Sequence, residues 1–145
     1  MVGIMEKKWI YLDDVRTPVD PKWVVVRTYE EFVYKVTEIG LENIQQISFD
    51  HDLGPSAMTE WHRNVYSNYQ LNYDNILEKT GMDCTKWLVE QWLEGKPVVD
   101  VYIHSANAIG SANMMGYINN YRHIHSLPQN CVRVNIEHTV EKSWE

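Results

Sequence analysis

Three clusters of polar side chains follow short apolar runs in this sequence, and each carries residue types that handle metal ions, protons or phosphates. The clusters are Asp13–Asp14, Asp50–Asp52 and His104–Asn107. Carboxylates supply the oxygen ligands that Mg²⁺ and Mn²⁺ prefer, and imidazole exchanges protons near neutral pH. Carboxylates that gather at one place repel one another unless a cation lies between them. If the three clusters meet in the fold, they predict a metal site that handles phosphate.

Each cluster also has an ordinary structural interpretation. A single Asp after a strand most often caps a turn or a helix, and Asn107 and Ser111 are suited to capping the helix that follows them. His104 fits a hydrogen-bonded core histidine as well as a catalytic one, and His51 sits between two acids that could hold it in a structural ion pair. The coincidence of three clusters at three strand ends favours a functional site.

The apolar runs before these clusters predict the strands that position them. Strands are expected at Trp9–Leu12, Trp23–Val26, Ile44–Phe49, Val98–Ile103 and Val132–Ile136. Helical patterns lie between them, so the alternation predicts right-handed crossovers and a mostly parallel, layered sheet. The carboxyl ends of parallel strands share one edge, which is where ligands bind in this class of fold.

Three helices are indicated by capping residues and apolar spacing. Thr28 and Glu31 form a capping-box pattern, and Gly40 suits the end of that helix. A second helix is expected from roughly Asp83 to Leu93, and a third along Met114–Tyr121.

The bulk composition narrows the function classes. With 145 residues, 44% hydrophobic and 23% charged, the chain has the balance of one ordinary soluble domain. A net charge of −7 argues against binding extended duplex nucleic acid, although a bound metal can still attract a small phosphorylated ligand. Cys84 and Cys131 match no zinc or redox spacing and are expected to be reduced, buried thiols. Because no apolar run reaches membrane-spanning length and no signal-peptide core is present, we expect a cytoplasmic location and no membrane partner.

The polar clusters resemble those of the receiver superfamily, the flavodoxin-like domains that accept a phosphoryl group on an aspartate. The resemblance places the family's acidic pair on Asp13 and Asp14, and its phosphoacceptor on Asp50. The hydroxyl residue and Ala that end the fourth strand match Ser105–Ala106, and Asp52 falls where the family supplies a backbone carbonyl to the metal.

Two features depart from receivers. Receivers carry a lysine at the end of the last strand, and Val132–Glu137 contains none. Receivers also have a helix directly after the first strand, where this chain has a loop through Arg16 and Pro18. Both departures argue against ordinary phosphorelay signalling.

A narrower resemblance fits better. Leu12–Pro18, Asp50–Gly54, Thr80–Asp83 and His104–Asn107 together look like the cyclic-phosphate-processing receiver-like family. The resemblance implies an α/β, flavodoxin- or receiver-like layered fold with a five-stranded, mostly parallel sheet. In this chain we expect a loop in place of the first helix. The expected domain spans residues 1–145, with an aromatic-rich insert at 55–78 after the third strand.

The activity implied by this family is the opening of a cyclic phosphate on a nucleotide or an RNA end, which makes the protein a phosphodiesterase-type hydrolase. Mg²⁺ or Mn²⁺ would bind Asp13, Asp14 and Asp50 and activate water. The catalytic candidates are the histidines, which could move the proton, the central aspartate and two donors to the phosphoryl oxygens: His104, His51, Asp50, Ser105 and Asn107. Arg16 and Arg27 could provide planar forks for phosphate, although Arg16 could instead tie its loop to an aspartate.

The insert between residues 55 and 78 crowds aromatic side chains over the same edge of the sheet. We expect it to form a lid that stacks on the base of a small nucleotide ligand, through the substrate-binding candidates Trp61, Arg63, Tyr66 and Tyr69. The same rings could instead pack a local mini-core or the interface of a homo-oligomer.

Two other functions stay open at this stage. One is a non-catalytic protein that sequesters or senses a cyclic nucleotide. The other, which the two departures disfavour, is an atypical response regulator phosphorylated on Asp50.

Overall fold

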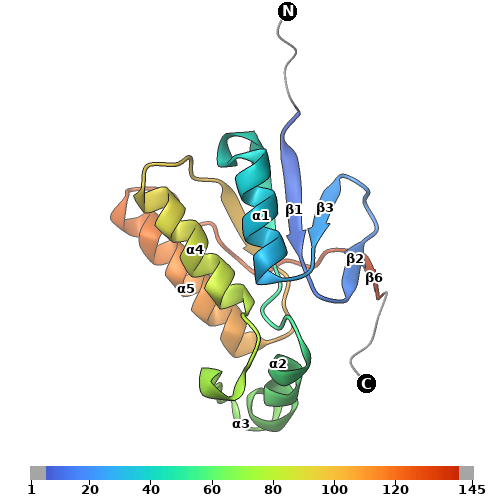
Figure 1. The fold of residues 1–145 in the computed structure, drawn as a ribbon. Helices are drawn as coiled ribbons and strands as arrows, with labels where there is room; N and C mark the ends of the chain where they lie inside the picture. The colour runs from blue at the N-terminus through green and yellow to red at the C-terminus, as the bar shows by residue number, and fades with distance from the viewer. Residues whose placement is uncertain (1–5, 141–145) are drawn as a thin grey trace, which may run out of the picture.

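The computed structural model describes residues 6–140, and the centre of this part of the chain is a four-stranded parallel sheet (Figure 1). Its strands are β1 (Lys8–Leu12), β3 (Trp23–Val26), β4 (Ile44–Phe49) and β5 (Asp100–Ile103). Their order across the sheet is β3-β1-β4-β5, which is the layered α/β arrangement of receiver- and flavodoxin-like folds. Because the strands are parallel, their carboxyl ends meet at one edge.

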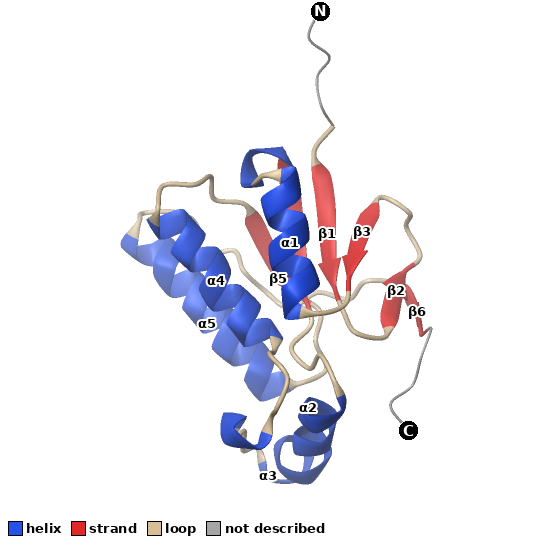
Figure 2. Cartoon of the chain, viewed as in Figure 1, coloured by secondary structure: helices blue, strands red, loops and turns tan. Residues whose placement is uncertain are grey.

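Three helices pack against one face of this sheet (Figure 2). They are α1 (Tyr29–Ile39), α4 (Gly81–Leu93) and α5 (Ala108–Ile124), and a 3₁₀ turn at Leu41–Asn43 leads from α1 into β4. The buried core lies between this face and the helices. The strands contribute alternate residues to it, as the register predicts: Ile10, Leu12, Val26, Ile47, Phe49, Val101 and Ile103.

The opposite face of the sheet carries aromatic side chains. Trp9 and Trp23 pack edge to face with ring centroids 5.5 Å apart, and Tyr11, which is fully buried, lies 5.7 Å from Trp23. Near the carboxyl edge a second, antiparallel pair forms from β2 (Arg16–Pro18) and β6 (His138–Val140). The C-terminal part of the chain therefore returns to the loop that follows β1.

The sheet differs from the predicted one at its edge. The fifth strand expected at Val132–Ile136 is reduced, within residues 6–140, to a single parallel bridge between Ile103 and Arg133. Two backbone hydrogen bonds hold it, from Ile103 N–H to Val132 O and from Val134 N–H to Ile103 O. The residues that follow pair with β2 instead of β5, so the edge strand ends after one bridge. The loop expected in place of a first helix is confirmed, since the described chain between β1 and β3 contains no helix.

The helix ends refine two predictions. The Thr28 hydroxyl accepts a hydrogen bond from Glu31 N–H as expected, but the Glu31 carboxylate accepts from Arg27 N–H, so the capping box is only half formed. Gly40 ends α1 with φ of 87°, a conformation that suits glycine. Helix α4 starts earlier than predicted, because Thr80 is its N-cap and Asp83 completes a full capping box from the third helical position.

The insert folds into short helical segments below the carboxyl edge of the sheet (Figure 1). These are α2 (Pro55–Glu60), a π-helical turn at Trp61–Val65, α3 (Tyr66–Asn68) and a 3₁₀ turn at Tyr73–Asn75. Within residues 6–140 no helix combines the length and apolar character needed to cross a membrane.

Two acidic side chains hold the insert together. Buried Glu60 accepts hydrogen bonds from the side chains of Asn64 and Asn75, each at 2.8 Å, and from Asn72 N–H at 2.9 Å. Glu78 accepts from the Ser56 hydroxyl and from the backbone N–H of Ala57. These bonds close the insert into one compact unit.

Candidate functional site

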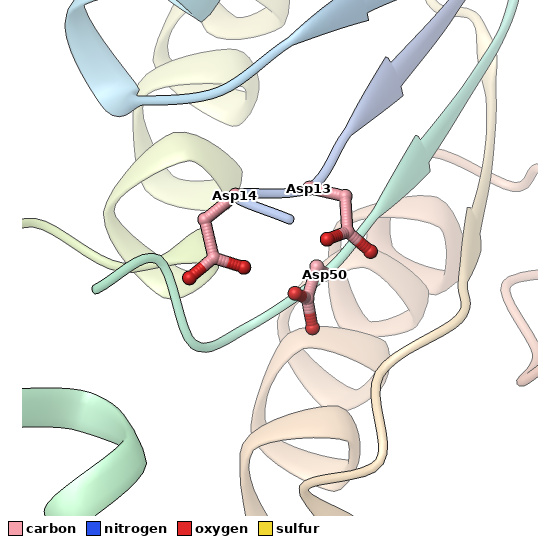
Figure 3. Close-up of side chains that lie close together, drawn as sticks. All are labelled: Asp13, Asp14 and Asp50. Carbon is pink, nitrogen blue, oxygen red and sulfur yellow. The ribbon is translucent and has the colours of Figure 1, made fainter. Parts of the chain in front are cut away.

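Three carboxylates converge at the carboxyl edge of the sheet (Figure 3). Asp13 and Asp14 follow β1 and Asp50 follows β4, and these two strands are direct neighbours. One oxygen from each side chain lies within 4.8 Å of the others. Asp13 and Asp50 are buried and Asp14 is half-buried. An all-oxygen set of this kind fits Mg²⁺ or Mn²⁺, so these residues could hold a divalent metal.

The Asp13 carboxylate is fixed by several donors. Its Oδ1 accepts hydrogen bonds from the backbone N–H groups of Val15 (3.0 Å) and Arg16 (2.8 Å). Its Oδ2 lies 2.6 Å from Arg16 Nε and 3.1 Å from His104 Nε2. Burial alone would raise the pKa of Asp13, but the hydrogen bond from His104 and the Arg16 guanidinium outweigh burial and lower it. Asp13 is therefore ionised and oriented.

Asp50 has the opposite electrostatic environment. Burial raises its pKa well above the ordinary value, and the charges of Asp13, Asp14 and Asp52 raise it further. The guanidinium of Arg16, 3.4 Å from Asp50 Oδ1, offsets this only in part. A carboxylate that is held among like charges is stabilised by a bound cation, which is the arrangement expected of a metal ligand.

His104 donates a hydrogen bond to the Asp13 carboxylate. Its ring stacks on Tyr11 at 4.2 Å, and its Nδ1 lies 2.7 Å from Ser48 Oγ. Because a carboxylate only accepts hydrogen bonds, Nε2 carries the proton toward Asp13 and Nδ1 accepts from the Ser48 hydroxyl. Burial lowers the pKa of His104, so the neutral ring is favoured. Both ring nitrogens are engaged, and this fixes the orientation of Asp13.

His51 is fully buried beneath the insert. Its Nδ1 lies 2.7 Å from Asp52 Oδ1, and its Nε2 lies 2.9 Å from the Tyr73 hydroxyl. The glycine at position 110 makes room for this ring, because a Cβ there would lie 2.4 Å from it. His51 thus connects the insert to the sheet edge.

Ser105 and Asn107 organise the loop after β5. Asn107 caps α5, since its Oδ1 accepts from Gly110 N–H at 2.8 Å, and its Nδ2 donates to Asp52 Oδ1 at 3.1 Å. The Ser105 hydroxyl accepts from Asn107 N–H at 3.1 Å. The capping role considered for Asn107 is confirmed.

Two adjoining cavities open at this edge. The first, which we call the acidic cavity, has a volume of about 210 Å³, and the residues that mark it out are Asp14, Asp50, Asp52, Met58 and Trp61. The second, which we call the arginine cavity, measures about 430 Å³ and is marked out by His104, Arg133, Val134 and Asn135. Both cavities share walls from Arg16, Ser105 and Ala106.

The two predicted phosphate-binding arginines have different positions. Arg16 lies between the cavities, where it contacts Asp13 and Asp50 and donates from Nη2 to His104 O at 3.2 Å. The tie between this loop and Asp13 is therefore present. Arg27 donates to the backbone oxygens of Asp13 and Arg16 and to Thr17 Oγ1, and it lines neither cavity. It braces the loop after β1.

The aromatic candidates of the insert are only partly brought to the site. Trp61, at the start of the π-helical turn, lines the acidic cavity. Tyr66 packs on Trp61 at 5.3 Å but is 73% exposed, and Tyr69 is 77% exposed. Tyr66, Tyr69 and the exposed Arg63 line neither cavity.

Sequence reasoning missed Arg133 and Met58, and it considered Tyr73 only as one of the aromatic residues of the insert. The sequence held a signal that could have identified Arg133. It lies in the expected last strand, where receivers have a lysine and this chain has none. Its side chain donates from Nε and Nη2 to Ser105 O, at 3.0 and 2.7 Å. Tyr73 and Met58 belong to the insert, where no periodic pattern indicates which side chains turn inward.

Comparison with known proteins adds one finding. The family model for the cyclic-phosphate processing receiver domain matches residues 8–120, from the first residue of β1 into α5. The matched range contains the three carboxylates, the two candidate histidines His51 and His104, and the insert. No curated protein and no solved structure matches the chain.

Proposed function

Because the chain belongs to the family of cyclic-phosphate processing receiver domains, we propose that it is a metal-dependent phosphoesterase that opens a cyclic phosphate on a nucleotide or an RNA end. The observation that carries this proposal is the convergence of Asp13, Asp14 and Asp50 beside a cavity that Arg16 and Ser105 also line. A cation held by carboxylates and donors for the phosphoryl oxygens are two ways in which enzymes stabilise the charge that develops when a phosphodiester is hydrolysed.

Asp13, Asp14 and Asp50 would hold Mg²⁺ or Mn²⁺. The bound ion would supply Lewis acidity and lower the pKa of water at the site. Arg16 and the Ser105 hydroxyl bind the phosphoryl oxygens, where negative charge grows during the reaction. Arg16 is suited to this because its guanidinium is already held against Asp13 and Asp50, so little conformational freedom is lost on binding.

The two histidines act through their neighbours. His104 fixes the Asp13 carboxylate, and His51 fixes Asp52, which lines the acidic cavity outside the metal-binding set. We assign Asp52, oriented by His51, to accepting the proton of the attacking water. As the new bond from the water oxygen to phosphorus forms, one P–O bond of the ring breaks, and the ribose oxygen that leaves takes up this proton from Asp52. The proton-transfer role expected for the histidines becomes a positioning role in this proposal.

The nucleoside would lie against the insert. Met58 and Trp61 give the acidic cavity an apolar wall, and the indole of Trp61 offers a face on which a base can stack. The insert therefore serves as the lid of the site through these two residues.

The test is a turnover screen by chromatography with Mg²⁺ or Mn²⁺, across 3′,5′-cyclic nucleotides, 2′,3′-cyclic phosphates and cyclic dinucleotides. We expect a ring-opened product that disappears with EDTA and in Asp14→Asn. The control is Asp20→Asn, which removes an exposed carboxylate remote from the cavities and should leave turnover unchanged.

Two results would contradict the proposal. If every ligand is recovered intact but one raises the melting temperature, the protein is a binding module for that ligand. If no ligand is cleaved or bound while Asp50 takes up phosphoryl groups from a phosphodonor, the protein is a response regulator.

A further inference from the structure

Arg133 presents a positive charge that no described acidic group neutralises. It is exposed, and across residues 6–140 no carboxylate forms an ion pair with it. Its Nε and Nη2 are anchored on Ser105 O, and its Nη1 has no hydrogen-bond partner within the same described residues. The hydrogen bonds to the Ser105 carbonyl thus hold the Arg133 side chain in place, while Nη1 of its guanidinium remains available to a ligand.

The arginine cavity differs in charge from the acidic cavity beside it. Its walls include Arg16 and Arg133 and contain no carboxylate, whereas the acidic cavity is lined by three aspartates. His104 contributes a ring that burial keeps neutral, and Asn135 adds an amide. Arg16 is already ion-paired with Asp13 and Asp50, so the uncompensated charge of this cavity is that of Arg133. In a chain of net charge −7, a wall with such a cation and no carboxylate is suited to an anion.

We propose that the arginine cavity binds a second phosphoryl group of the substrate. The preferred ligand is then a nucleoside 2′,3′-cyclic phosphate that also carries a phosphoryl group on its 5′ oxygen. This inference rests on the proposed function, because it assumes that the cyclic phosphate occupies the acidic cavity. It concerns Arg133, which lies outside the range that the family model matches.

The shape of such a ligand agrees with the layout of the site. In a nucleoside 2′,3′-cyclic phosphate the base, the cyclic phosphate and the 5′ oxygen leave the ribose in three directions. The structure offers an apolar wall at Met58 and Trp61, a carboxylate cluster with Arg16, and the cavity of Arg133. A 3′,5′-cyclic mononucleotide uses its 5′ oxygen within the ring and has no group for the third place.

Two sources of this chemistry exist, a free 5′-phosphorylated mononucleotide and the 3′ end of an RNA, whose last phosphodiester lies on the same 5′ oxygen. Three ligands separate them: adenosine 2′,3′-cyclic phosphate with a 5′ hydroxyl, the same compound with a 5′ phosphate, and a dinucleotide that ends in a 2′,3′-cyclic phosphate. Each is assayed for kcat/KM with Mg²⁺ and for Kd by calorimetry.

We expect the two ligands with a second phosphoryl group to be preferred over the 5′ hydroxyl ligand by roughly 10- to 100-fold, the range of a charge-assisted hydrogen bond. Arg133→Ala should remove this preference while the 5′ hydroxyl ligand changes by no more than about twofold. Arg133→Lys should keep part of it. The control Lys96→Ala removes an exposed cation beyond the C-terminal end of α4 and should keep all of it. A dinucleotide preferred over the monophosphate identifies an RNA end, and the reverse identifies a free nucleotide.

The inference and the proposed function fail in different ways. Equal kcat/KM for all three ligands in the wild type overturns the inference and leaves the function standing. An equal loss for all three in Arg133→Ala also overturns it, because Arg133 would then act through Ser105 or on the cyclic phosphate itself. If no ligand is cleaved, the proposed function fails. The intact ligands then allow the calorimetric preference to decide the inference alone, and an absence of binding overturns both.

Discussion

Replacing Asp50 with Asn should stabilise the protein without metal and abolish its stabilisation by Mg²⁺. Asp50 is only 6% exposed, and burial and its acidic neighbours raise its pKa. A raised pKa means that the folded state binds the proton more tightly than the unfolded state. The stability that this proton supplies is fully present below the unfolded pKa and is lost as the pH rises through the folded pKa. Ionisation of Asp50 therefore lowers the stability of the metal-free protein as the pH rises.

The size of the effect follows from the separations at the site. The three ligand oxygens lie within 4.8 Å of one another, and at that outer limit two charges repel by about 3.5 kcal/mol at an effective dielectric constant of about 20. Asp50 faces two such charges, in Asp13 and Asp14. The attraction between Asp50 and Arg16, 3.4 Å away, offsets about 5 kcal/mol of this repulsion on the same scale. Removing the Asp50 charge thus gains about 2 kcal/mol net. For a domain of this size that corresponds to a rise in melting temperature of roughly 4–8 °C.

Differential scanning calorimetry in EDTA and in excess Mg²⁺ provides the assay. The wild type should gain about 2.7 kcal/mol when Mg²⁺ is at about 100 times its Kd, and Asp50→Asn should gain nothing. In EDTA the melting temperature of the wild type should rise as the pH is lowered from neutral toward 5, and that of the variant should rise less. The control Asp20→Asn, 55% exposed, should stay within about 0.5 kcal/mol of the wild type.

A lower melting temperature for Asp50→Asn in EDTA would refute this reasoning. It would show that the contact with Arg16 and the hydrogen bond from His51 N–H, at 2.8 Å, outweigh the repulsion among the carboxylates. The cluster would then be a self-compensated ion-pair network with no need of a cation.

Three further outcomes are expected. Trp61→Ala should weaken binding of a nucleotide ligand by about 1–3 kcal/mol in calorimetry, whereas Tyr69→Ala, at a ring 77% exposed, should not change it. Gly110→Ala should lower stability by about 1–3 kcal/mol because the new Cβ lies 2.4 Å from a buried imidazole. Gly116→Ala, with open space around it in the same helix, should raise stability by about 1 kcal/mol. If thermal unfolding ranks the two glycine variants in the reverse order, the packing around position 110 accommodates a Cβ. His104→Ala should weaken Mg²⁺ binding roughly 10- to 100-fold in calorimetric titration, because Asp13 loses a hydrogen bond that orients it; unchanged Mg²⁺ affinity would separate His104 from the metal site.

The acidic cluster could be predicted because it depends on one general property of parallel sheets. Asp13, Asp14 and Asp50 each follow a short apolar run, and parallel strands bring such positions to one edge whatever the details of the loops. The adjacency of β1 and β4 places the two segments side by side. The sequence therefore sufficed for the metal-binding candidates without any knowledge of side-chain contacts.

The environment of each histidine could not be predicted in the same way. His51 appears in the sequence between two acids, but its Nε2 partner is Tyr73, 22 residues away in the insert. His104 appears beside Ser105, but its ring is engaged by Ser48 in β4 and by Asp13, which follows β1. Hydrogen bonds of this kind are set by the packing of distant elements, and no local spacing encodes them. For the two histidines, local pattern identified the sheet edge to which they belong and left their roles undetermined.

The loop that stands in place of the first receiver helix supplies a cation to the site, which has no lysine in its last expected strand. In the described part of the chain, the cation that forms an ion pair with Asp50 is Arg16, which comes from this loop and not from the last strand. The last strand contributes Arg133, whose guanidinium is bound to Ser105 O and lines the arginine cavity instead of the acidic one. A phosphoryl group attached covalently to Asp50 would have to displace Arg16 from a contact that also holds Asp13. A cyclic phosphate in the acidic cavity reaches Arg16 as a diffusible ligand and needs no covalent bond to Asp50, so the contact between Arg16 and Asp50 favours a diffusible phosphate ester over an aspartyl phosphate.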